Sequence, residues 1–290
     1  MSTALRTRWL ALLRVLGISH FTAKSSLGHP FVCHVGDFLG ENPFYNRTAF
    51  HVELTVCAAC LHQENAPVIL DVGANVGYWS SQLAQLLAAR RPKIYAFEPV
   101  PSTFAKLMKS VETLDLAHTV IAIPAAVRDR SGPVAISYAP WDSLLAQVVK
   151  EKPNIRVGNR IAYAASTTLD DFCRTFDIVP SLIKVDVEGS EVDVLKGATS
   201  LLKGPAPPYV AFEFNPLTLS EMGHKGRDIE ELLEGYALHY VDDFESQRHP
   251  VGMPLQSLDG IDWVCNVIAV PKRAVGRWDA AASMASRPQW

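Results

Sequence analysis

Short apolar runs alternate with amphipathic segments of helical periodicity from about residue 67 onward. The apolar runs are bounded by turn residues and are typical of buried strands, whereas the segments between them repeat their apolar residues at helical spacing. The expected strands are 68–72, 93–98, 120–123, 182–187, 209–214 and 263–270, and the expected helices are 78–89, 101–114, 168–176, 188–202 and 228–234. Such alternation predicts an α/β fold with a doubly wound, mostly parallel sheet and helices on both faces.

Length and composition bound the number of domains and exclude one class of partner. With 290 residues, 48% of them hydrophobic, the chain can build one large core or two small ones. Its 27 basic and 30 acidic residues give a formal net charge of −3, which argues against a nucleic-acid partner because phosphates need a basic face. We expect an N-terminal helical extension over 1–60, the α/β domain over 61–270, a tail over 271–290, and an irregular lid or substrate wall at 139–166.

The N-terminal segment mixes basic and apolar residues without reaching the length of a membrane span. The apolar residues that lie near one face of its expected amphipathic helix are Leu5, Trp9, Leu12, Leu13 and Leu16. Arg14 interrupts the apolar run, which is far shorter than the ~20 residues that a transmembrane helix needs. We therefore expect no membrane span.

The five cysteines of the chain show no repeated spacing. An odd number without a pattern does not make a disulfide framework, so reduced thiols and a cytoplasmic location are the expectation. Cys57 and Cys60 lie in an apolar stretch of helical character, and we interpret them as small core residues rather than as a redox or zinc pair.

A strand, a glycine turn and a helix N-terminus follow one another in the segment 68–77, VILDVGANVG. Gly73 and Gly77 allow the backbone to bend sharply and a ligand to approach without meeting a Cβ atom. The helix N-terminus presents N–H groups that suit a carboxylate or a phosphate. Glu98 ends the next strand, where an acid can accept hydrogen bonds from both hydroxyls of a ribose. These residues predict a ligand that contains an adenosine-like ribose.

Two residues of the turn distinguish between classes of cofactor. Dinucleotide-binding folds place a glycine where this chain has Asn75. Asp71, just before the turn, would repel a pyrophosphate and attract the ammonium group of a methionine moiety. Both differences favour S-adenosylmethionine over a nicotinamide cofactor.

Five blocks of the sequence resemble, in the same order, those of the FkbM-type methyltransferases. The blocks are DVGANVGYWS, YAFEPVPSTF, STTLDDFC, LIKVDVEGSEVDVLKGA and YVAFEF, and they cover about residues 67–215. The resemblance implies a class I methyltransferase fold, which is Rossmann-like, with S-adenosylmethionine as donor and a hydroxyl group of a small molecule, sugar or secondary metabolite as acceptor. The residues that it assigns to the cofactor site are Asp71, Gly73, Asn75, Gly77 and Glu98.

The loop after the third strand is expected to lie near the adenine ring in this fold. Ala126 is a candidate for contact with the ring, and Asp129 for accepting a hydrogen bond from its amino group. Asp129 suits a turn equally well, because it lies in the sequence DRSG.

Carboxylates follow the expected strands 182–187 and 209–214. Asp186 and Glu188 flank Val187, which points both side chains to the same side of an extended chain, and Glu213 lies near the end of the other strand. Because a hydroxyl acceptor must lose a proton, we expect Asp186 to act as the base, with Glu188 or Glu213 as substitutes. Lys184 is expected to pair with Asp186.

Three oxygen-bearing side chains near these strand ends would suit magnesium: Asp186, Glu213 and Asn215. No third acid with an obvious spacing completes such a site, so we favour methyl transfer without a metal. Two other interpretations stay open from the residues: a nicotinamide-dependent oxidoreductase, and a non-catalytic nucleotide-binding module of the same fold.

Overall fold

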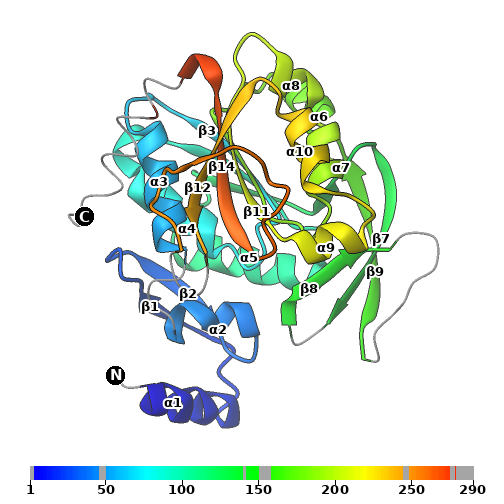
Figure 1. Cartoon of the computed structure of the whole chain (residues 1–290). Helices are drawn as coiled ribbons and strands as arrows, with labels where there is room; N and C mark the ends of the chain where they lie inside the picture. The colour runs from blue at the N-terminus through cyan, green and yellow to red at the C-terminus, as the bar shows by residue number, and fades with distance from the viewer. Residues whose placement is uncertain are drawn as a thin grey trace.

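The computed structural model describes residues 3–45, 50–139, 142–149, 158–243, 248–274 and 278. Within these ranges an eight-stranded sheet has the order β13-β12-β14-β11-β10-β3-β4-β5 (Figure 1). Its strands are β3 (Val68–Val72), β4 (Lys93–Phe97), β5 (Val120–Ile123), β10 (Leu182–Val185), β11 (Tyr209–Phe214), β12 (Tyr236–Asp242), β13 (Pro254–Leu255) and β14 (Cys265–Pro271). The strands from β5 to β11 are parallel, and β14 pairs antiparallel with β11 and β12. The predicted doubly wound, mostly parallel sheet is confirmed.

The order of the strands reverses between β3 and β10. From β3 the chain moves outward to β4 and β5, and it later adds β10 and β11 on the other side of β3. In an open parallel sheet the ligand lies at such a switch point, beyond the carboxyl ends of the strands. Val72 of β3 is in register with Val185 of β10, so Gly73 and Asp186 follow at the same edge of the sheet.

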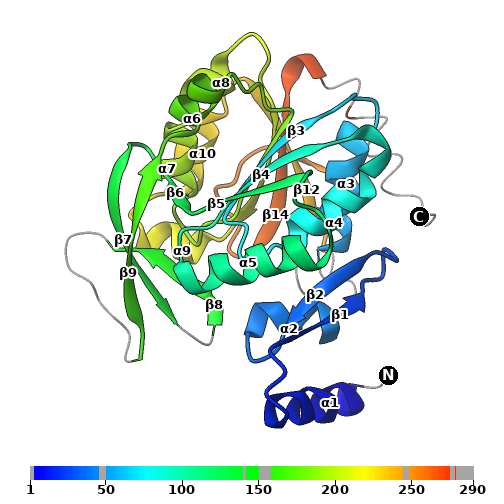
Figure 2. The same cartoon turned by 180° about the vertical axis from the view of Figure 1, so that it is seen from behind.

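Helices cover both faces of this sheet (Figures 1 and 2). One face carries α3 (His51–Leu61), α4 (Tyr78–Leu86) and α5 (Pro101–Thr113), and the other carries α6 (Leu169–Phe176), α7 (Glu191–Lys196), α8 (Thr199–Lys203) and α10 (Gly226–Leu232). Successive strand residues point to opposite faces. Accordingly Ile69 joins the core that contains Leu83, and Leu70 joins the core that contains Val192.

Three segments between the predicted elements differ from expectation. The single helix predicted over 188–202 forms α7 and α8, which are separated at Gly197; a Cβ there would lie 2.0 Å from the Arg128 carbonyl oxygen, so the close contact with Arg128 requires glycine. A short helix, α9 (Pro216–Glu221), follows β11, and a 3-10 turn, η1 (Ala88–Arg90), follows α4.

The N-terminal segment contains a β-hairpin between helices. Its elements are α1 (Thr3–Val15), β1 (His20–Lys24), β2 (Pro30–His34) and α2 (Phe38–Tyr45), with β1 and β2 antiparallel. Phe31 of β2 packs edge-on against Tyr78 of α4, with ring centroids 5.3 Å apart, and the Gln82 side chain donates to the Pro30 carbonyl at 2.8 Å. The predicted all-helical extension over 1–60 is therefore wrong for 20–34, where backbone pairing and packing on α4 stabilise strands.

A second sheet occupies much of the segment that we expected to be irregular. Its strands are β6 (Ala125–Val127), β7 (Gly132–Ala139), β8 (Asp142–Val148) and β9 (Arg160–Thr167), in the order β6-β9-β7-β8. Val134 and Ile136 of β7 pack on one face with Ala126 of β6 and with Val100, which precedes α5. This one-sided burial favours strands, which corrects the expectation of irregular structure in 139–166; residues 140–141 and 150–157 of that range lie outside the described residues.

The cysteines and the C-terminal segment bear on two further expectations. All five cysteines are free and buried. Cys57 and Cys60 lie on α3 within the core, so their interpretation as core residues is confirmed. After β14 a 3-10 turn, η2 (Lys272–Ala274), begins the predicted tail, of which only Trp278 is described beyond residue 274; its ring packs against His239. Of the helices described, none combines the length and apolar character of a bilayer span.

Candidate active site

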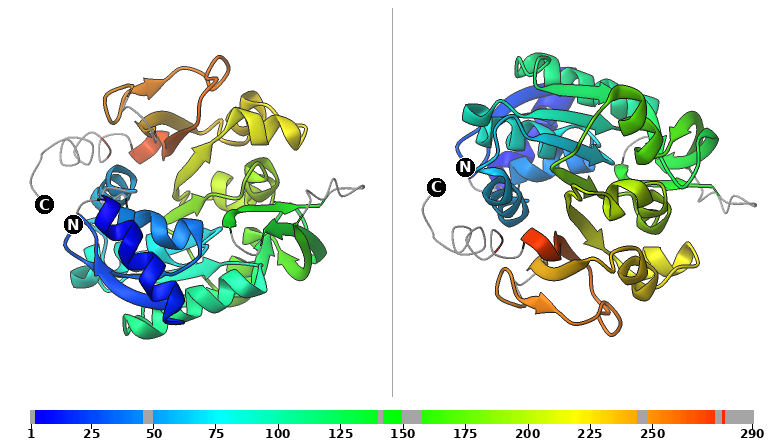
Figure 3. Two further views of the ribbon diagram at one scale, coloured as in Figure 1. Left: turned by 90° about the horizontal axis from the view of Figure 1, so that it is seen from below. Right: turned by 90° about the horizontal axis from the view of Figure 1, so that it is seen from above.

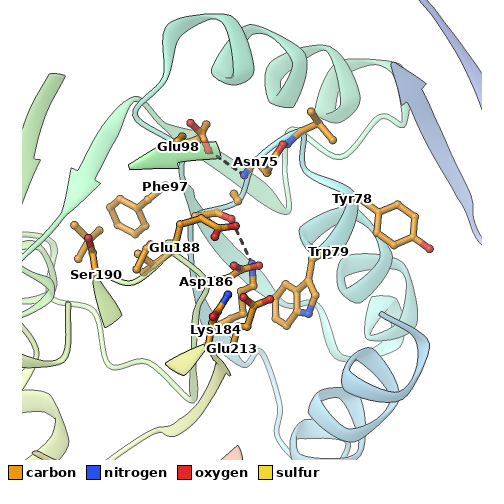
Figure 4. A pocket seen from close by; sticks show the side chains of 18 of the residues that line it. Asn75, Tyr78, Trp79, Phe97, Glu98, Lys184, Asp186, Glu188, Ser190 and Glu213 are labelled. Atoms are coloured by element: carbon orange, nitrogen blue, oxygen red, sulfur yellow. Dashed lines mark hydrogen bonds and ion pairs between the residues drawn. The ribbon is translucent and has the colours of Figure 1, made fainter. Parts of the chain in front are cut away.

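A cavity of about 760 Å³ opens where β3, β4, β10 and β11 end. Its volume lies in the range of small-molecule sites. Figure 4 shows Asn75 and Glu98 at one end of the cavity and Lys184, Asp186 and Glu213 at the other. The cavity therefore joins the predicted cofactor turn to the predicted catalytic carboxylates.

The glycines of the turn are required by contacts within the chain. Gly73 has φ +82°, and a Cβ atom there would lie 1.9 Å from the backbone oxygen of Asp186. Gly77 also has φ +82°, and its Cβ would lie 2.5 Å from the Leu107 side chain of α5. Gly73 lines the cavity and Gly77 does not. Gly77 therefore makes room for α5 and not for a ligand, whereas at Gly73 the close approach of a ligand stays a prediction beside the contact with Asp186.

Glu98 connects the loops that follow β3 and β4. The Asn75 N–H donates to its Oε2 at 3.1 Å, and the Val100 N–H donates to its Oε1 at 2.8 Å. Burial raises the pKa of Glu98 to about 7, although these two hydrogen bonds lower it. Asn75 itself has φ 51°, in the left-handed region that asparagine tolerates better than most residues. The carboxylate is thus fixed at the cavity wall, with both oxygens bonded to backbone.

Asp71 lies beneath the turn, outside the cavity lining. It is fully buried, accepts a hydrogen bond from Ser80 Oγ at 2.5 Å, and lies 3.4 Å from the Lys184 ammonium. The prediction that Asp71 receives the ammonium group of a cofactor does not fit this position, because the ammonium group of Lys184 already lies against the Asp71 carboxylate.

The two candidates for the adenine loop are separated. Ala126 of β6 lines the cavity beside Val127. Asp129 does not line it; its Oδ1 lies 4.0 Å from the guanidinium groups of both Arg128 and Arg130. The hypothesis that Asp129 accepts a hydrogen bond from adenine does not fit, because its carboxylate lies among arginines of its own turn.

Lys184 is the buried cation at the centre of the site. Its ammonium lies 3.2 Å from Asp186 Oδ2, which confirms the predicted pair, and donates to the Gly73 carbonyl at 3.3 Å. Burial alone would lower the pKa of Lys184, but the carboxylates of Asp186, Asp71 and Glu53 raise it above its ordinary value. Lys184 therefore stays charged and balances the charge of Asp186.

Glu213 lies across the cavity from the turn, close to Asp186 (Figure 4). Burial, and then the carboxylates of Asp186 and Glu188, hold the pKa of Glu213 well above its usual range. A carboxylate of raised pKa is the stronger proton acceptor. Asp186, Glu188 and Glu213 all line the cavity, so the structure brings together the three carboxylates that the sequence offers as bases.

The loop after β10 has a strained backbone that its own helix supports. Glu188 lines the cavity with φ 51°, a conformation that few residues other than glycine and asparagine adopt. Glu191, at the start of α7, accepts hydrogen bonds from the N–H groups of Val187 at 3.3 Å and Gly189 at 3.1 Å. Sequence patterns did not single out Glu191, because an acid in the first turn of a helix is common.

The remaining wall of the cavity comes from segments that no motif indicated. Asn42 comes from α2, Val148 from β8, and Arg248 and Trp263 from the region between β12 and β14. The Arg248 guanidinium lies over the Trp263 ring, 5.0 Å from its centroid, and 4.0 Å from Asp243 Oδ2. Asp243 also accepts from the Tyr240 hydroxyl at 2.7 Å and from the Arg248 N–H at 2.8 Å, so it is bonded to both residues.

In the part of the chain that the structure describes, no three His, Cys, Asp or Glu side chains converge as metal ligands. Of the carboxylates that line the cavity, Asp186 pairs with Lys184 at 3.2 Å.

The protein has a class I methyltransferase fold. The features that define this class are the cavity at the switch point, the glycine turn after β3, and the acid Glu98 after β4. A family model described as the methyltransferase FkbM domain matches residues 71–240, which is more than half of the 290-residue chain. The chain belongs to this family.

Curated relatives are similar over about half of the chain. Hexuronic acid methyltransferase AglP of Haloferax volcanii is 28% identical over 142 residues, which are 48% of this chain and 53% of the relative. Methyltransferase sdnD of Sordaria araneosa is 27% identical over 157 residues, which are 45% of this chain and 60% of the relative. The matches thus span between about half and three-fifths of the relatives' own length.

Solved structures resemble the chain at low identity. Methyltransferase FkbM from Methylobacillus flagellatus KT aligns with a TM-score of 0.41 and 14% identity, over 79% of this chain and 60% of that one. A SAM-dependent methyltransferase from Agrobacterium tumefaciens aligns with a TM-score of 0.46 and 10% identity, over 88% of this chain and 71% of that one.

Proposed function

We propose that this chain is an S-adenosylmethionine-dependent methyltransferase that methylates a hydroxyl group of an acidic sugar or a related small molecule. The observation that carries the proposal is the acidic wall of the cavity, formed by Glu98, Asp186, Glu188 and Glu213. A bound cation favours the charged forms of Glu98 and Glu213, whose pKa values are raised, so such a wall suits the sulfonium and ammonium groups of S-adenosylmethionine and disfavours the pyrophosphate of a nicotinamide cofactor. This electrostatic argument is independent of Asp71, on which the sequence-based argument depended.

Several lining residues fit the parts of this cofactor. Glu98 has lone pairs left after its two backbone hydrogen bonds, because a carboxylate accepts about four, and it would accept from the ribose hydroxyls. Ala126 and Phe97 offer an apolar surface to the adenine ring. When bound, the cofactor supplies an electrophilic methyl group.

The chain itself has to align the acceptor and take its proton. Transfer is an in-line displacement, so holding the acceptor oxygen in line with the methyl carbon and the sulfur supplies much of the rate. Glu213 would take the hydroxyl proton, since its pKa is raised and it lines the cavity. Asp186 would act through its charge, which Lys184 balances at 3.2 Å.

The acceptor class rests on Arg248 and on one relative. Arg248 places a guanidinium in the cavity wall, where it would pair with a carboxylate of the acceptor. The relative AglP is a hexuronic acid methyltransferase, which is consistent with an acidic sugar as acceptor.

Turnover with S-adenosylmethionine tests the proposal. The pure full chain would be incubated with matched pairs of acceptors, a uronic acid glycoside and the corresponding neutral glycoside, and the products examined by mass spectrometry. We expect one added methyl group on the uronic acid, on a hydroxyl oxygen, and unchanged turnover in EDTA. Methylation of the neutral sugar alone would contradict the acceptor class, and loss of turnover in EDTA would restore the magnesium hypothesis.

A further inference from the structure

The helix α1 lies at one end of the molecule and contacts the rest of the chain through one side (Figures 1 and 3). Leu10 and Leu13 on this side are buried. Arg6 donates to the Phe44 carbonyl of α2 at 2.7 Å, and Arg14 pairs with Glu41 of α2 at 2.7 Å. These contacts hold α1 against α2 in one orientation.

The adjoining side of α1 is apolar and exposed to solvent. Leu5, Trp9, Leu12 and Leu16 are spaced by four and three residues, so they share one side of the helix. Val15 is 84% and Leu16 61% exposed. Of the five residues expected on one amphipathic face, only Leu13 is buried, so the apolar stripe faces outward instead of toward the core.

We call this surface the α1 apolar face, and its members are Leu5, Trp9, Leu12, Val15, Leu16 and the adjacent Ile18. They are six of the eleven large hydrophobic residues that are exposed within the described ranges. Single exposed apolar residues are ordinary, whereas a contiguous group marks an interaction surface.

The charges of α1 favour one kind of partner. The helix carries Arg6, Arg8 and Arg14 and no acidic residue, and Arg8 lies exposed beside the apolar residues. Of the three, Arg14 is neutralised by Glu41. A basic helix that presents leucine and tryptophan on one side is typical of segments that lie in the plane of an anionic lipid interface. Tryptophan is itself enriched at the level of the headgroups.

The size of the face argues against a second copy of the chain as its partner. Thirteen residues form a helix about 20 Å long, and one side of it about 10 Å wide offers roughly 200 Å². A stable protein interface buries about 600 Å² or more on each partner. Two such faces would also bring arginines of the same sign together.

We propose that the α1 apolar face docks on an anionic lipid surface, with the helix lying parallel to the membrane plane. This inference is independent of the proposed methyl transfer. It has a consequence for the cavity, because α1 contacts α2 through Arg6 and Arg14. The helix α2 in turn contributes Asn42 and Pro43 to the cavity lining. Docking would therefore turn the α2 side of the cavity toward the lipid surface.

Vesicle sedimentation of the full chain tests the proposal. We expect binding to vesicles of phosphatidylglycerol mixed with phosphatidylcholine, weaker binding to phosphatidylcholine alone, and a decrease with added salt because charges are screened. The triple variant Leu12→Ser, Val15→Ser, Leu16→Ser should lose about tenfold or more in partition coefficient, because it removes three side chains that would enter the interface. The matched control is Val179→Ser with Leu217→Ser, which are 64% and 68% exposed elsewhere and should bind as the unchanged chain does.

Two further measurements keep the test decisive if the triple variant folds poorly. Arg8→Gln alone should weaken binding to the anionic vesicles, and lipids with brominated chains should quench more fluorescence in the unchanged chain than in Trp9→Phe. Failure of the unchanged chain to bind anionic vesicles would overturn the proposal. Equal vesicle binding by a folded triple variant would also overturn it. So would self-association in ultracentrifugation that depends on these residues, together with no binding to vesicles.

Discussion

The two walls of the cavity differ in how far apart in the sequence their residues lie. Gly73, Asn75 and Glu98 come from the ends of two adjacent strands that are consecutive in the chain. The rest of the lining takes Asn42 from α2 and Arg248 from the region between β12 and β14, residues that only the complete fold brings together. The first group of residues can therefore be predicted from a local sequence motif, whereas the second can be identified only from the three-dimensional structure. The comparison also separates their tasks, since we assign the cofactor to the first and the acceptor to the second.

The largest effect is expected at Glu213, which lines the cavity across from the turn. Glu213→Gln removes the proposed proton acceptor, and kcat should fall by about 10²-fold or more. Cofactor affinity should change little, because the turn and Glu98 are untouched. Asp186→Asn is the comparison variant and should lose less in kcat, since Lys184 already balances that carboxylate. The reverse order of the two losses would return Asp186 to the role of base.

A smaller effect, confined to the cofactor wall, is expected at Glu98. Glu98→Ala removes charge-assisted hydrogen bonds worth about 1.5–3 kcal/mol each, so cofactor affinity should fall at least about tenfold. KM for the acceptor should stay close to that of the unchanged chain. Because Glu98 also ties two loops together, thermal unfolding of the variant serves as the control. A folded variant with normal cofactor affinity would assign Glu98 a purely structural role.

The acceptor wall is tested at Arg248. Arg248→Gln should raise KM for an acidic acceptor by about tenfold, the loss expected for one charged hydrogen bond at a partly solvated site, and leave cofactor affinity unchanged. Arg130→Gln is the matched control, because Arg130 is exposed and lies outside the cavity lining. A shift in cofactor affinity, with KM unaltered, would show that the two walls are not separate.

Most of the main sheet was predictable because its strands are short apolar runs, buried on both faces, such as Ile69 and Leu70. The hairpin at 20–34 could not be predicted, because its burial depends on packing against α4. The sheet β6-β9-β7-β8 could not be predicted either, because only one of its sides carries buried apolar residues. In the site, the glycine-turn motif and the acid after the next strand predicted that Gly73 and Glu98 line the cavity, but not which residues they contact. It placed Asp71 in the ligand site, whereas the fold turns that carboxylate onto Lys184. Spacing along a chain cannot show which of two charges lies nearer.

An effect on stability rather than on turnover is expected at Glu53 of α3, which is buried. Burial raises the pKa of Glu53 from 4.5 to about 8, against the opposing effect of Lys184. Between these two pH values the folded chain binds a proton that the unfolded chain has lost, so rising pH lowers the free energy of unfolding by about 1.4 kcal/mol per unit for this group. Glu53→Gln should remove the contribution of this group to the pH dependence of the free energy of unfolding. Relative to the unchanged chain, the variant should therefore be more stable near pH 8 than near pH 5.

Thermal or urea unfolding of both proteins between pH 5 and 8 measures the difference. Glu98 and Glu191, whose pKa values are raised to about 7, contribute the same sign of slope in both proteins and serve as an internal reference. Equal slopes would mean that Glu53 titrates as it does in the unfolded chain.

Calorimetric titration with S-adenosylmethionine, S-adenosylhomocysteine and NAD tests the central claim, that the acidic cavity receives a sulfonium cofactor. We predict binding of both sulfur compounds and none of NAD. Because the sulfonium of S-adenosylmethionine is charged, added salt should weaken its binding more than that of S-adenosylhomocysteine. Binding of NAD, with no response to either sulfur compound, would contradict the assignment of this cavity.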